Sequence, residues 1–198
     1  MIQLIVGLGN PGEEHKKDRH NAGFWFIEAM ASALKTRREY EKRFLGYVGK
    51  AKLNGLERYF YLLEPDTFMN LSGQSVGSFC RFHQLSAETV LVVHDELDLK
   101  PGVARLKFGG GTGGHNGLKD IHAHLGSANF WRLRIGIGHP RNLADERKSI
   151  EVVDYVLKKA RKEEQSEIDT ALANALAVMP LVLTGEMQNA TQTLHTNC

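Results

Sequence analysis

The segment Gly111-Thr112-Gly113-Gly114-His115-Asn116-Gly117-Leu118-Lys119-Asp120-Ile121 joins a glycine-rich hinge to the start of a predicted helix. Gly109 and Gly110 lengthen the hinge on its amino-terminal side. Glycine loses more backbone entropy on folding than any other residue, so such a dense run is costly unless the chain bends sharply, moves or lies against a ligand. A plain flexible loop is the alternative, but polar groups able to touch a substrate follow directly, which favours a binding loop.

Strand and helix patterns alternate on both sides of this hinge. Apolar or alternating runs predict strands at 3–8, 90–93, 103–108 and 132–137, and Asn54-Gly55 predicts the turn of a hairpin over 44–63. Apolar spacing predicts helices at 24–30, with Asn21 as N-cap, at 71–82 and at 116–125. Two further helical stripes lie at 152–157 and 168–179. The pattern predicts an α/β fold with a twisted mixed β-sheet flanked by helices on both faces.

Length and composition limit the class of protein. The 198 residues fit a single catalytic domain over 1–198, and we expect 185–198 to be a mobile tail. A net charge of +2 excludes a polybasic arm but permits a local basic patch, so nucleic acid is an allowed partner and not an implied one. Cys80 and Cys198 are too few for a disulfide framework, which favours a cytoplasmic location, and Cys80 is expected to be an inert core thiol.

Targeting and membrane segments are not expected. The chain starts with an apolar strand pattern and lacks a basic leader before it. We find no apolar stretch that approaches the roughly 20 residues needed to span a bilayer. The sequence therefore predicts no membrane partner.

Gly7-Leu8-Gly9-Asn10-Pro11-Gly12 matches the glycine fingerprint of dinucleotide-binding proteins, but its context argues against that function. The fingerprint should open a helix that holds the pyrophosphate, whereas a polar stretch without an apolar stripe follows Gly12. The acidic residue expected about 20 positions further on should end a second strand. Glu28 is near that distance but lies in the first predicted helix. A nucleotide-binding oxidoreductase is therefore disfavoured.

Three asparagines follow or precede predicted elements at what we expect to be one rim of the sheet. Asn10 follows the first strand, Asn70 precedes a helix and Asn116 follows the glycine hinge. In such folds, ligands bind beyond the carboxyl ends of the strands. An uncharged amide offers one acceptor and two donors, which suits hydrogen bonding to esters, amides and ribose hydroxyls. The alternative for Asn10 and Asn70 is a role in turns and caps.

His20 and Asp95 form a candidate general-base pair. Asp95 ends a run of buried strand residues, where an unpaired carboxylate would be expensive, and His20 is a candidate partner. A carboxylate that fixes a neutral imidazole is a common arrangement for a general base. The sequence lacks a Gly-x-Ser-x-Gly elbow, and Cys80 lacks a polar neighbour, so a water nucleophile is favoured over a covalent one.

Two further groups of polar residues are candidates for a metal site and a phosphate site. His122 and His124 are two positions apart on a predicted helix, and His94 and Asp95 are adjacent on a strand, so neither pair has metal-ligand spacing. Lys107 and Arg134 are expected on the solvent face of two strands, with Arg132 on the same face as Arg134. Together, Lys107 and Arg134 could hold one phosphate, although a solvated strand face is an equal alternative.

These residues resemble the bacterial peptidyl-tRNA hydrolase family. Gly111 and His115 through Ile121 match one family signature without a break, and Arg19-His20-Asn21-x-Gly23 matches another. Two positions depart from that second signature, since His15 stands where an aromatic residue is usual and Asp18 where threonine is usual. Further matches are Gly7 to Gly12, Phe68-Met69-Asn70-Leu71-Ser72-Gly73, His94 to Leu99 and Leu133 to Pro140.

The resemblance implies an enzyme of translation that hydrolyses the ester between a peptide and the 3′ end of tRNA. It implies His20 as the catalytic base and Asp95 as its orienting partner. It further implies that Asn10, Met69, Asn70, His115 and Asn116 bind the substrate and that Lys107 and Arg134 bind the tRNA 5′ phosphate. The partners would be the acceptor stem and nascent peptide, with no metal or organic cofactor, no obligate protein partner and a monomeric chain. A non-catalytic RNA-binding module of the same fold is the alternative.

Overall fold

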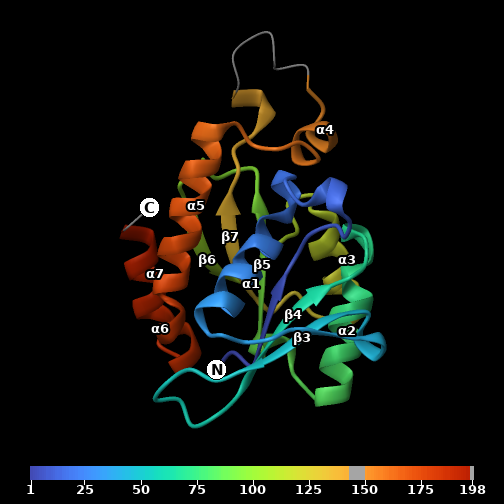
Figure 1. The fold of residues 1–198 in the computed structure, drawn as a ribbon, viewed down its shortest axis with the longest axis vertical. Helices are drawn as coiled ribbons and strands as arrows, with labels where there is room; N and C mark the ends of the chain where they lie inside the picture. The colour runs from blue at the N-terminus through green and yellow to red at the C-terminus, as the bar shows by residue number, and fades with distance from the viewer. Residues whose placement is uncertain (143–149, 197–198) are drawn as a thin grey trace.

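The computed structural model describes residues 1–142 and 150–196, and its sheet confirms the predicted α/β class. Within these residues, one mixed sheet has the strand order β2-β3-β4-β1-β5-β7-β6 (Figure 1). The strands are β1 (Leu4–Gly7), β2 (Glu39–Glu41), β3 (Gly46–Ala51), β4 (Phe60–Pro65), β5 (Val90–Glu96), β6 (Ala104–Phe108) and β7 (Trp131–Gly136).

The central strands of the sheet are parallel and share one carboxyl edge. β1 pairs in parallel with both β4 and β5, and β5 pairs in parallel with β7. The outer strands β2, β3 and β6 run antiparallel to their neighbours. β1 and β5 therefore end side by side, and the chain segments that follow them meet at the edge where ligands bind in such sheets.

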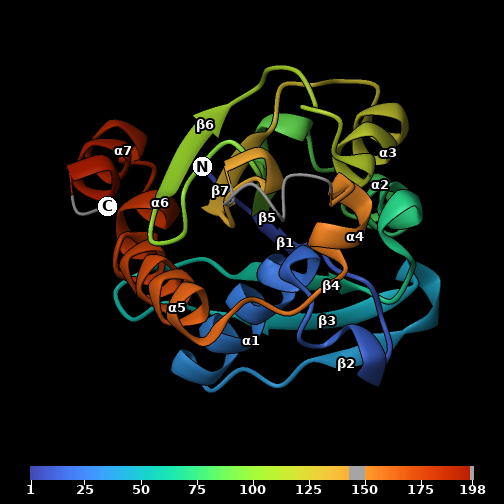
Figure 2. The same cartoon turned by 90° about the horizontal axis from the view of Figure 1, so that it is seen from above.

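Helices cover both faces of the sheet, as predicted. Figure 2 shows α1 and α5 on one side of the central strands and α2 and α3 on the other. Successive residues of β5 divide between the two cores, since Leu91 and Val93 pack on the α1 side and Val90 and Val92 on the α2 side. The helices are α1 (Ala22–Ala33), α2 (Ser72–His83), α3 (Asn116–Leu125), α4 (Val152–Val156), α5 (Lys162–Ala177), α6 (Met179–Thr184) and α7 (Met187–Thr196).

The glycine at the end of β1 allows close packing against α1. A Cβ atom on Gly7 would lie 2.2 Å from the carbonyl oxygen of Gly23, so only glycine lets β1 approach α1 this closely. Gly12 leads into η1 (Glu13–His15), a 3-10 helix of three residues. The dinucleotide fingerprint therefore lacks the helix amino terminus that would hold a pyrophosphate.

Several predictions about individual segments are wrong or incomplete. The hairpin exists, but β3 ends at Ala51 and β4 begins at Phe60, so the turn at Asn54-Gly55 is part of a longer loop. In the expected tail, residues 187–196 form α7, whose Ala190 and Leu194 are buried because the helix packs on β6. Cys198 lies outside the described residues. Cys80 is buried, and burial raises the pKa of its thiol to about 11, as expected for an inert core thiol.

One helical span is more apolar than the sequence analysis allowed. Residues Lys162–Thr184, which form α5 and α6, are long and apolar enough to cross a membrane by length and composition. Ile168, Leu172, Val182 and Leu183 within this span are buried in the core on the α1 side. The hydropathy of this span is therefore accounted for by packing against the sheet, since core helices pass the same test.

Candidate active site

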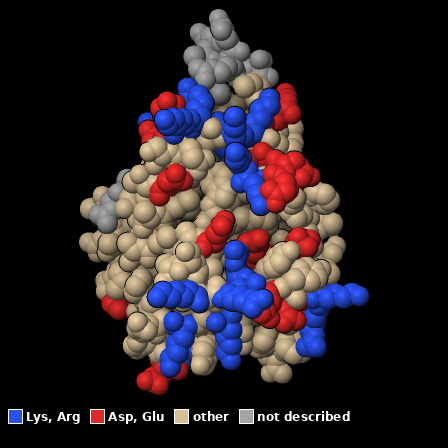
Figure 3. Space-filling view, viewed as in Figure 1, with Lys and Arg blue, Asp and Glu red and all other residues tan. Residues whose placement is uncertain are grey.

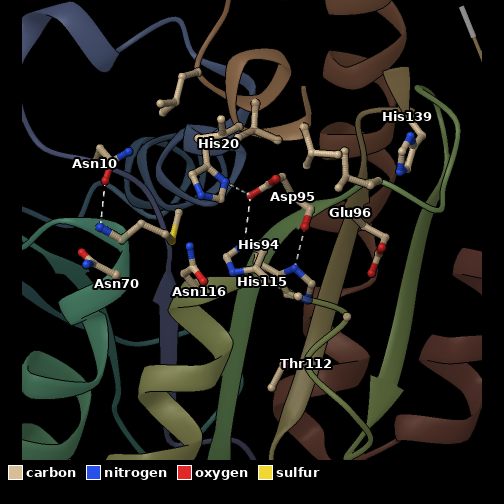
Figure 4. A pocket seen from close by; sticks show the side chains of 18 of the residues that line it. Asn10, His20, Asn70, His94, Asp95, Glu96, Thr112, His115, Asn116 and His139 are labelled. Atoms are coloured by element: carbon tan, nitrogen blue, oxygen red, sulfur yellow. Dashed lines mark hydrogen bonds and ion pairs between the residues drawn. The ribbon is translucent and has the colours of Figure 1, made fainter. Parts of the chain in front are cut away.

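His20 and His115 meet on the carboxylate of Asp95 at the carboxyl edge of the sheet. His20 lies in η2 (Arg19–Asn21), immediately before α1, Asp95 near the end of β5 and His115 at the N-cap of α3. The Oδ1 atom of Asp95 lies 2.8 Å from Nδ1 of His20 and 3.0 Å from Nε2 of His115 (Figure 4). The structure thus brings together two residues that are 75 positions apart in the sequence.

The hydrogen bonds fix which nitrogen of each imidazole carries the proton. The backbone N–H of Leu118 donates to Nδ1 of His115, so Nε2 of His115 carries the proton given to Asp95. Nδ1 of His94 donates to the main-chain carbonyl of Asp95 at 2.7 Å. Nδ1 of His20 donates to the ionised carboxylate, so in the neutral form of this ring, which lines the cleft, Nε2 carries the lone pair. That lone pair is the one available for a proton from water.

Burial and hydrogen bonding shift the pKa values of this cluster in different directions. Burial disfavours the charged imidazole of His20, but the charge and hydrogen bond of Asp95 outweigh it and raise its pKa above 6.5. Burial opposes ionisation of Asp95 as well, yet the two histidines hold its pKa well below the ordinary value. Burial, aided by His115, lowers the pKa of His94 to about 3, so this ring is neutral at physiological pH.

Asn10 is held so that its amide nitrogen remains for a ligand. Its Oδ1 accepts the backbone N–H of Met69 at 2.8 Å, which orients the side chain. Asn21 accepts from the main-chain N–H of Asn10 and donates to its carbonyl oxygen, both at 2.9 Å. Asn21 precedes α1 as predicted, but its side chain makes these bonds instead of capping the helix. The NH₂ group of Asn10 points toward His20 in Figure 4, where it can donate to a bound oxygen.

These polar groups line one cleft of about 670 Å³. Asn70 and Asn116 are exposed residues on its wall, and Asn70 comes from η4 (Met69–Leu71) (Figure 4). All the predicted catalytic and substrate-binding residues therefore face the same space, namely Asn10, His20, Met69, Asn70, Asp95, His115 and Asn116.

Apolar side chains also form part of the rim of this cleft. Val152 and Val153 were predicted as part of a helical stripe, but both are exposed and line the cleft together with Leu157. Phe68 and Leu97 complete the rim. Apolar spacing could not distinguish a stripe that packs on the core from one that faces a cavity.

Lys107 and Arg134 lie outside this cleft on neighbouring strands. The register pairs Lys107 of β6 with Arg132 of β7, and Arg105 with Arg134. Nε of Arg134 is 2.8 Å from Oε2 of Glu96, so the expected phosphate ligand already has an acidic partner. Arg132 was expected at the solvent face but is buried, with 3% of its surface exposed. The alternation of Arg132 with Leu133 predicts one solvent face and gives no sign that this strand is buried on both faces. The sequence pattern likewise did not indicate that Glu96 binds Arg134.

On one face of the molecule, the basic side chains do not form a continuous surface (Figure 3). On the face shown in Figure 3, lysine and arginine side chains alternate with acidic ones and gather toward the two ends of the molecule. This distribution agrees with the near-neutral net charge of +2. The charges on this face therefore form local clusters of either sign.

The donor set of His20, Asp95 and His115 is also a type that metal ions use. The three ligand atoms lie within 4.8 Å of one another. Both ring nitrogens, however, are directed at the same carboxylate oxygen at hydrogen-bond distance, which requires that each carries a proton. Metal binding would require both nitrogens to lose that proton, so the geometry fits a hydrogen-bonded network better than a metal centre.

The comparisons with known proteins agree on one family. A family model described as peptidyl-tRNA hydrolase matches residues 4–198. Peptidyl-tRNA hydrolases of Polynucleobacter asymbioticus and Polynucleobacter necessarius subsp. necessarius are 59% and 58% identical over 195 residues, which cover 98% of this chain and 98% of each relative. A crystal structure of peptidyl-tRNA hydrolase from Acinetobacter baumannii is 47% identical, superposes with a TM-score of 0.90, and covers 98% of this chain and 94% of its own.

Proposed function

Since this chain belongs to the peptidyl-tRNA hydrolase family and is an enzyme that hydrolyses peptidyl-tRNA, we propose that His20 is the general base and Asp95 its positioning partner. The observation that supports these roles is the hydrogen bond from Nδ1 of His20 to Asp95 inside the amide-lined cleft. The non-catalytic RNA-binding alternative is not favoured, because the related proteins of similar length are named as hydrolases.

In the proposed reaction, Nε2 of neutral His20 takes a proton from a water molecule as that water attacks the ester carbonyl carbon. The carboxylate of Asp95 stabilises the imidazolium that forms and keeps the ring in one orientation. When the tetrahedral intermediate collapses, the bond to the ribose oxygen breaks and the imidazolium returns the proton to that oxygen. The products are a free peptide carboxylic acid and a tRNA with a free ribose hydroxyl.

The amide groups of the cleft would bind the substrate around the reacting carbon. We assign Asn10 to the oxyanion, because its oriented NH₂ group faces the side of the cleft that holds His20. A donor of this kind contributes about 3 kcal/mol to transition-state stabilisation in other hydrolases. Asn70 and Asn116 are assigned to the peptide backbone and terminal ribose, and Met69 to the wall of the cleft.

His115 would act mainly as a positioning residue. Both of its ring nitrogens are engaged, one with Asp95 and one with the backbone N–H of Leu118. Its ring lies 5.0 Å from that of His20, centroid to centroid, and forms part of the cleft wall. We therefore assign His115 to substrate contact through its ring face and to orientation of Asp95 through Nε2.

The remaining features of the proposal concern the tRNA and the state of the protein. We assign binding of the tRNA 5′ phosphate to Lys107 and Arg134. When the phosphate binds, it would replace the carboxylate of Glu96 as the partner of Arg134. We propose one catalytic domain over residues 1–198 that acts in the cytoplasm as a monomer, without an obligate protein partner, metal or organic cofactor.

The roles of His20 and Asp95 are tested by single-turnover hydrolysis of a defined peptidyl-tRNA. We expect His20→Ala to abolish turnover while binding of uncharged tRNA stays within about twofold, because the ring contacts the reacting water and not the tRNA body. Asp95→Asn should reduce the rate at least about 100-fold, since Asn can no longer stabilise the imidazolium. Retained turnover in His20→Ala would remove the assignment.

A further inference from the structure

The side chain of Arg132 binds main-chain carbonyl groups at the start of the glycine hinge. Nη2 of Arg132 donates to the carbonyl oxygen of Gly110 at 2.6 Å, and Nη1 donates to that of Gly111 at 2.5 Å. The planar guanidinium presents two donor nitrogens at a fixed spacing, so it holds two adjacent carbonyls in one geometry, whereas lysine has a single rotatable ammonium group that does not fix such a geometry. The guanidinium also stacks 4.8 Å from the centre of the Phe130 ring, which fixes its plane.

The surroundings of Arg132 make the burial of its charge costly. It is buried, and the described residues place no carboxylate within ion-pair distance of its guanidinium, while its Nε has no hydrogen-bond partner there. Burial and the neighbouring Arg134 lower its pKa, and the charge of Glu96, which lies beyond ion-pair distance, offsets this only in part. A buried cation without a carboxylate is costly, and apolar residues often replace even paired buried charges without loss of stability. The position of the hinge therefore offers a better reason for this arginine than the stability of the fold.

The hinge that Arg132 holds leads directly into the active site. Gly109 and Gly110 have φ angles of 63° and 97°, so the chain turns sharply at the point where Arg132 holds it. At its other end, the hinge is fixed by His115, whose side chain bonds Asp95. Between these two anchors only residues 112–114 remain, and all three line the cleft. A shift of the first anchor would therefore move the cleft wall and the start of α3.

The same hinge touches the proposed phosphate site. Lys107 is the cross-strand partner of Arg132, and its Nζ would lie 3.1 Å from a Cβ atom built on Gly110. The residues assigned to the phosphate and to the reaction are thus joined by one short segment whose start depends on Arg132.

We propose that Arg132 is a positioning residue that holds the glycine hinge against β7 and thereby places His115 and Asn116 in the cleft. This inference rests on the proposed function of the cleft. Arg132 itself touches neither the ester nor the phosphate in this arrangement. Its contribution comes from the geometry of two hydrogen bonds and not from its charge alone.

Two substitutions separate the effect of the two hydrogen bonds of Arg132 from the effect of its positive charge. Arg132→Lys keeps the charge and loses the bidentate contact, whereas Arg132→Met loses both. We expect Arg132→Lys to lower kcat about 10-fold or more with KM for 5′-phosphorylated peptidyl-tRNA changed less than twofold. Arg132→Met should lower kcat similarly and raise KM, because a positive charge near Lys107 and Arg134 is also lost. Hydrogen exchange of amides 110–117 should accelerate in both variants.

Arg58 supplies a matched control. Its guanidinium also bridges two main-chain carbonyls, those of Ile2 and Leu183, and its Nε is also buried without a partner, but it does not line the cleft. Arg58→Lys should lower the melting temperature and leave kcat and hinge exchange unchanged. Addition of guanidinium ion should restore part of the activity of an Arg132→Ala variant and none of that lost in His20→Ala.

Three results would overturn the inference. One is a kcat within twofold of wild type in Arg132→Lys. Another is a loss of kcat without faster exchange at 110–117, and the third is an equal loss in Arg58→Lys. Failure of the proposed function has a different signature, namely retained turnover in His20→Ala while Arg132→Lys still loosens the hinge.

Discussion

At the scale of single residues, one aspartate sets the orientation of three imidazoles, two through its carboxylate and one through its main-chain carbonyl. Asp95 accepts from His20 and His115 through Oδ1, and its main-chain carbonyl accepts from His94. Each bond uses the proton on one ring nitrogen, so His20 has Nε2 left for chemistry. Asp95 in β5 therefore determines which nitrogen of His20 is available as the base.

The substitution Asn10→Asp tests the assignment of the oxyanion donor. Aspartate keeps an acceptor for the backbone N–H of Met69, so the local fold should be retained, but it has no NH₂ group to offer the oxyanion. We expect kcat to fall by about 100-fold, the typical effect of removing one oxyanion donor. The rates should be compared on the high-pH plateau of each protein, where the rate no longer rises with pH, so that a shift in the pKa of His20 caused by the new carboxylate does not enter the comparison. A kcat within threefold of wild type there would assign the oxyanion to another group.

At the scale of elements, the segment that carries His20 is tied to the carboxyl-terminal helices. Nη2 of Arg19 lies 2.8 Å from Oε2 of Glu164 in α5, and its Nη1 donates to the carbonyls of Tyr155 and Lys158. The guanidinium also lies 4.1 Å from the centre of the Tyr155 ring. These contacts hold η2 and the α4 wall of the cleft in one arrangement.

Removal of Glu164 should therefore cost stability. Both side chains of this ion pair are about nine-tenths buried, so Glu164→Ala leaves an unpaired buried guanidinium. We expect the free energy of unfolding to fall by about 3 to 5 kcal/mol, measured by urea denaturation. The exposed pair of Arg141 and Asp98 is the control, and Asp98→Ala should cost less than about 1 kcal/mol. An equal loss of unfolding free energy in Glu164→Ala and Asp98→Ala would contradict a structural role for the buried ion pair.

Element type was predictable where the apolar pattern is strong, and less so where packing or a cavity changes its meaning. β5, α2 and α3 lie where the sequence predicts them, because strand and helix periods differ clearly there. The predicted tail contains α7, since a short helix with few apolar residues is stabilised mainly by docking on β6. Burial of Arg132 was likewise invisible, because its partners are main-chain carbonyls that carry no sequence signal.

At the scale of the whole molecule, the parallel strands bring distant segments to one edge. β1 delivers Asn10, β5 delivers Asp95, and the segments before α1 and α3 deliver His20 and His115. Strand polarity and family resemblance predicted this set, and the structure places its cleft residues together. The hydrogen bonds that orient them, such as that of Asn21 with Asn10, could not be predicted, because they depend on distances of a few ångströms between separate loops.

The pH dependence of single-turnover hydrolysis, in wild type and in Asp95→Asn, tests the central claim most directly. The base acts when His20 is neutral, and Asp95 raises the pKa of His20, so the wild-type rate should fall as pH drops through a value above 6.5. In Asp95→Asn the pKa of His20 loses its main raising influence, and burial, which lowers it, is opposed only by the charge of Asp18, so the acid limb should move to lower pH while the plateau rate falls. A wild-type rate that stays constant from pH 5 to 8 would contradict the account, as would an acid limb that Asp95→Asn leaves in place.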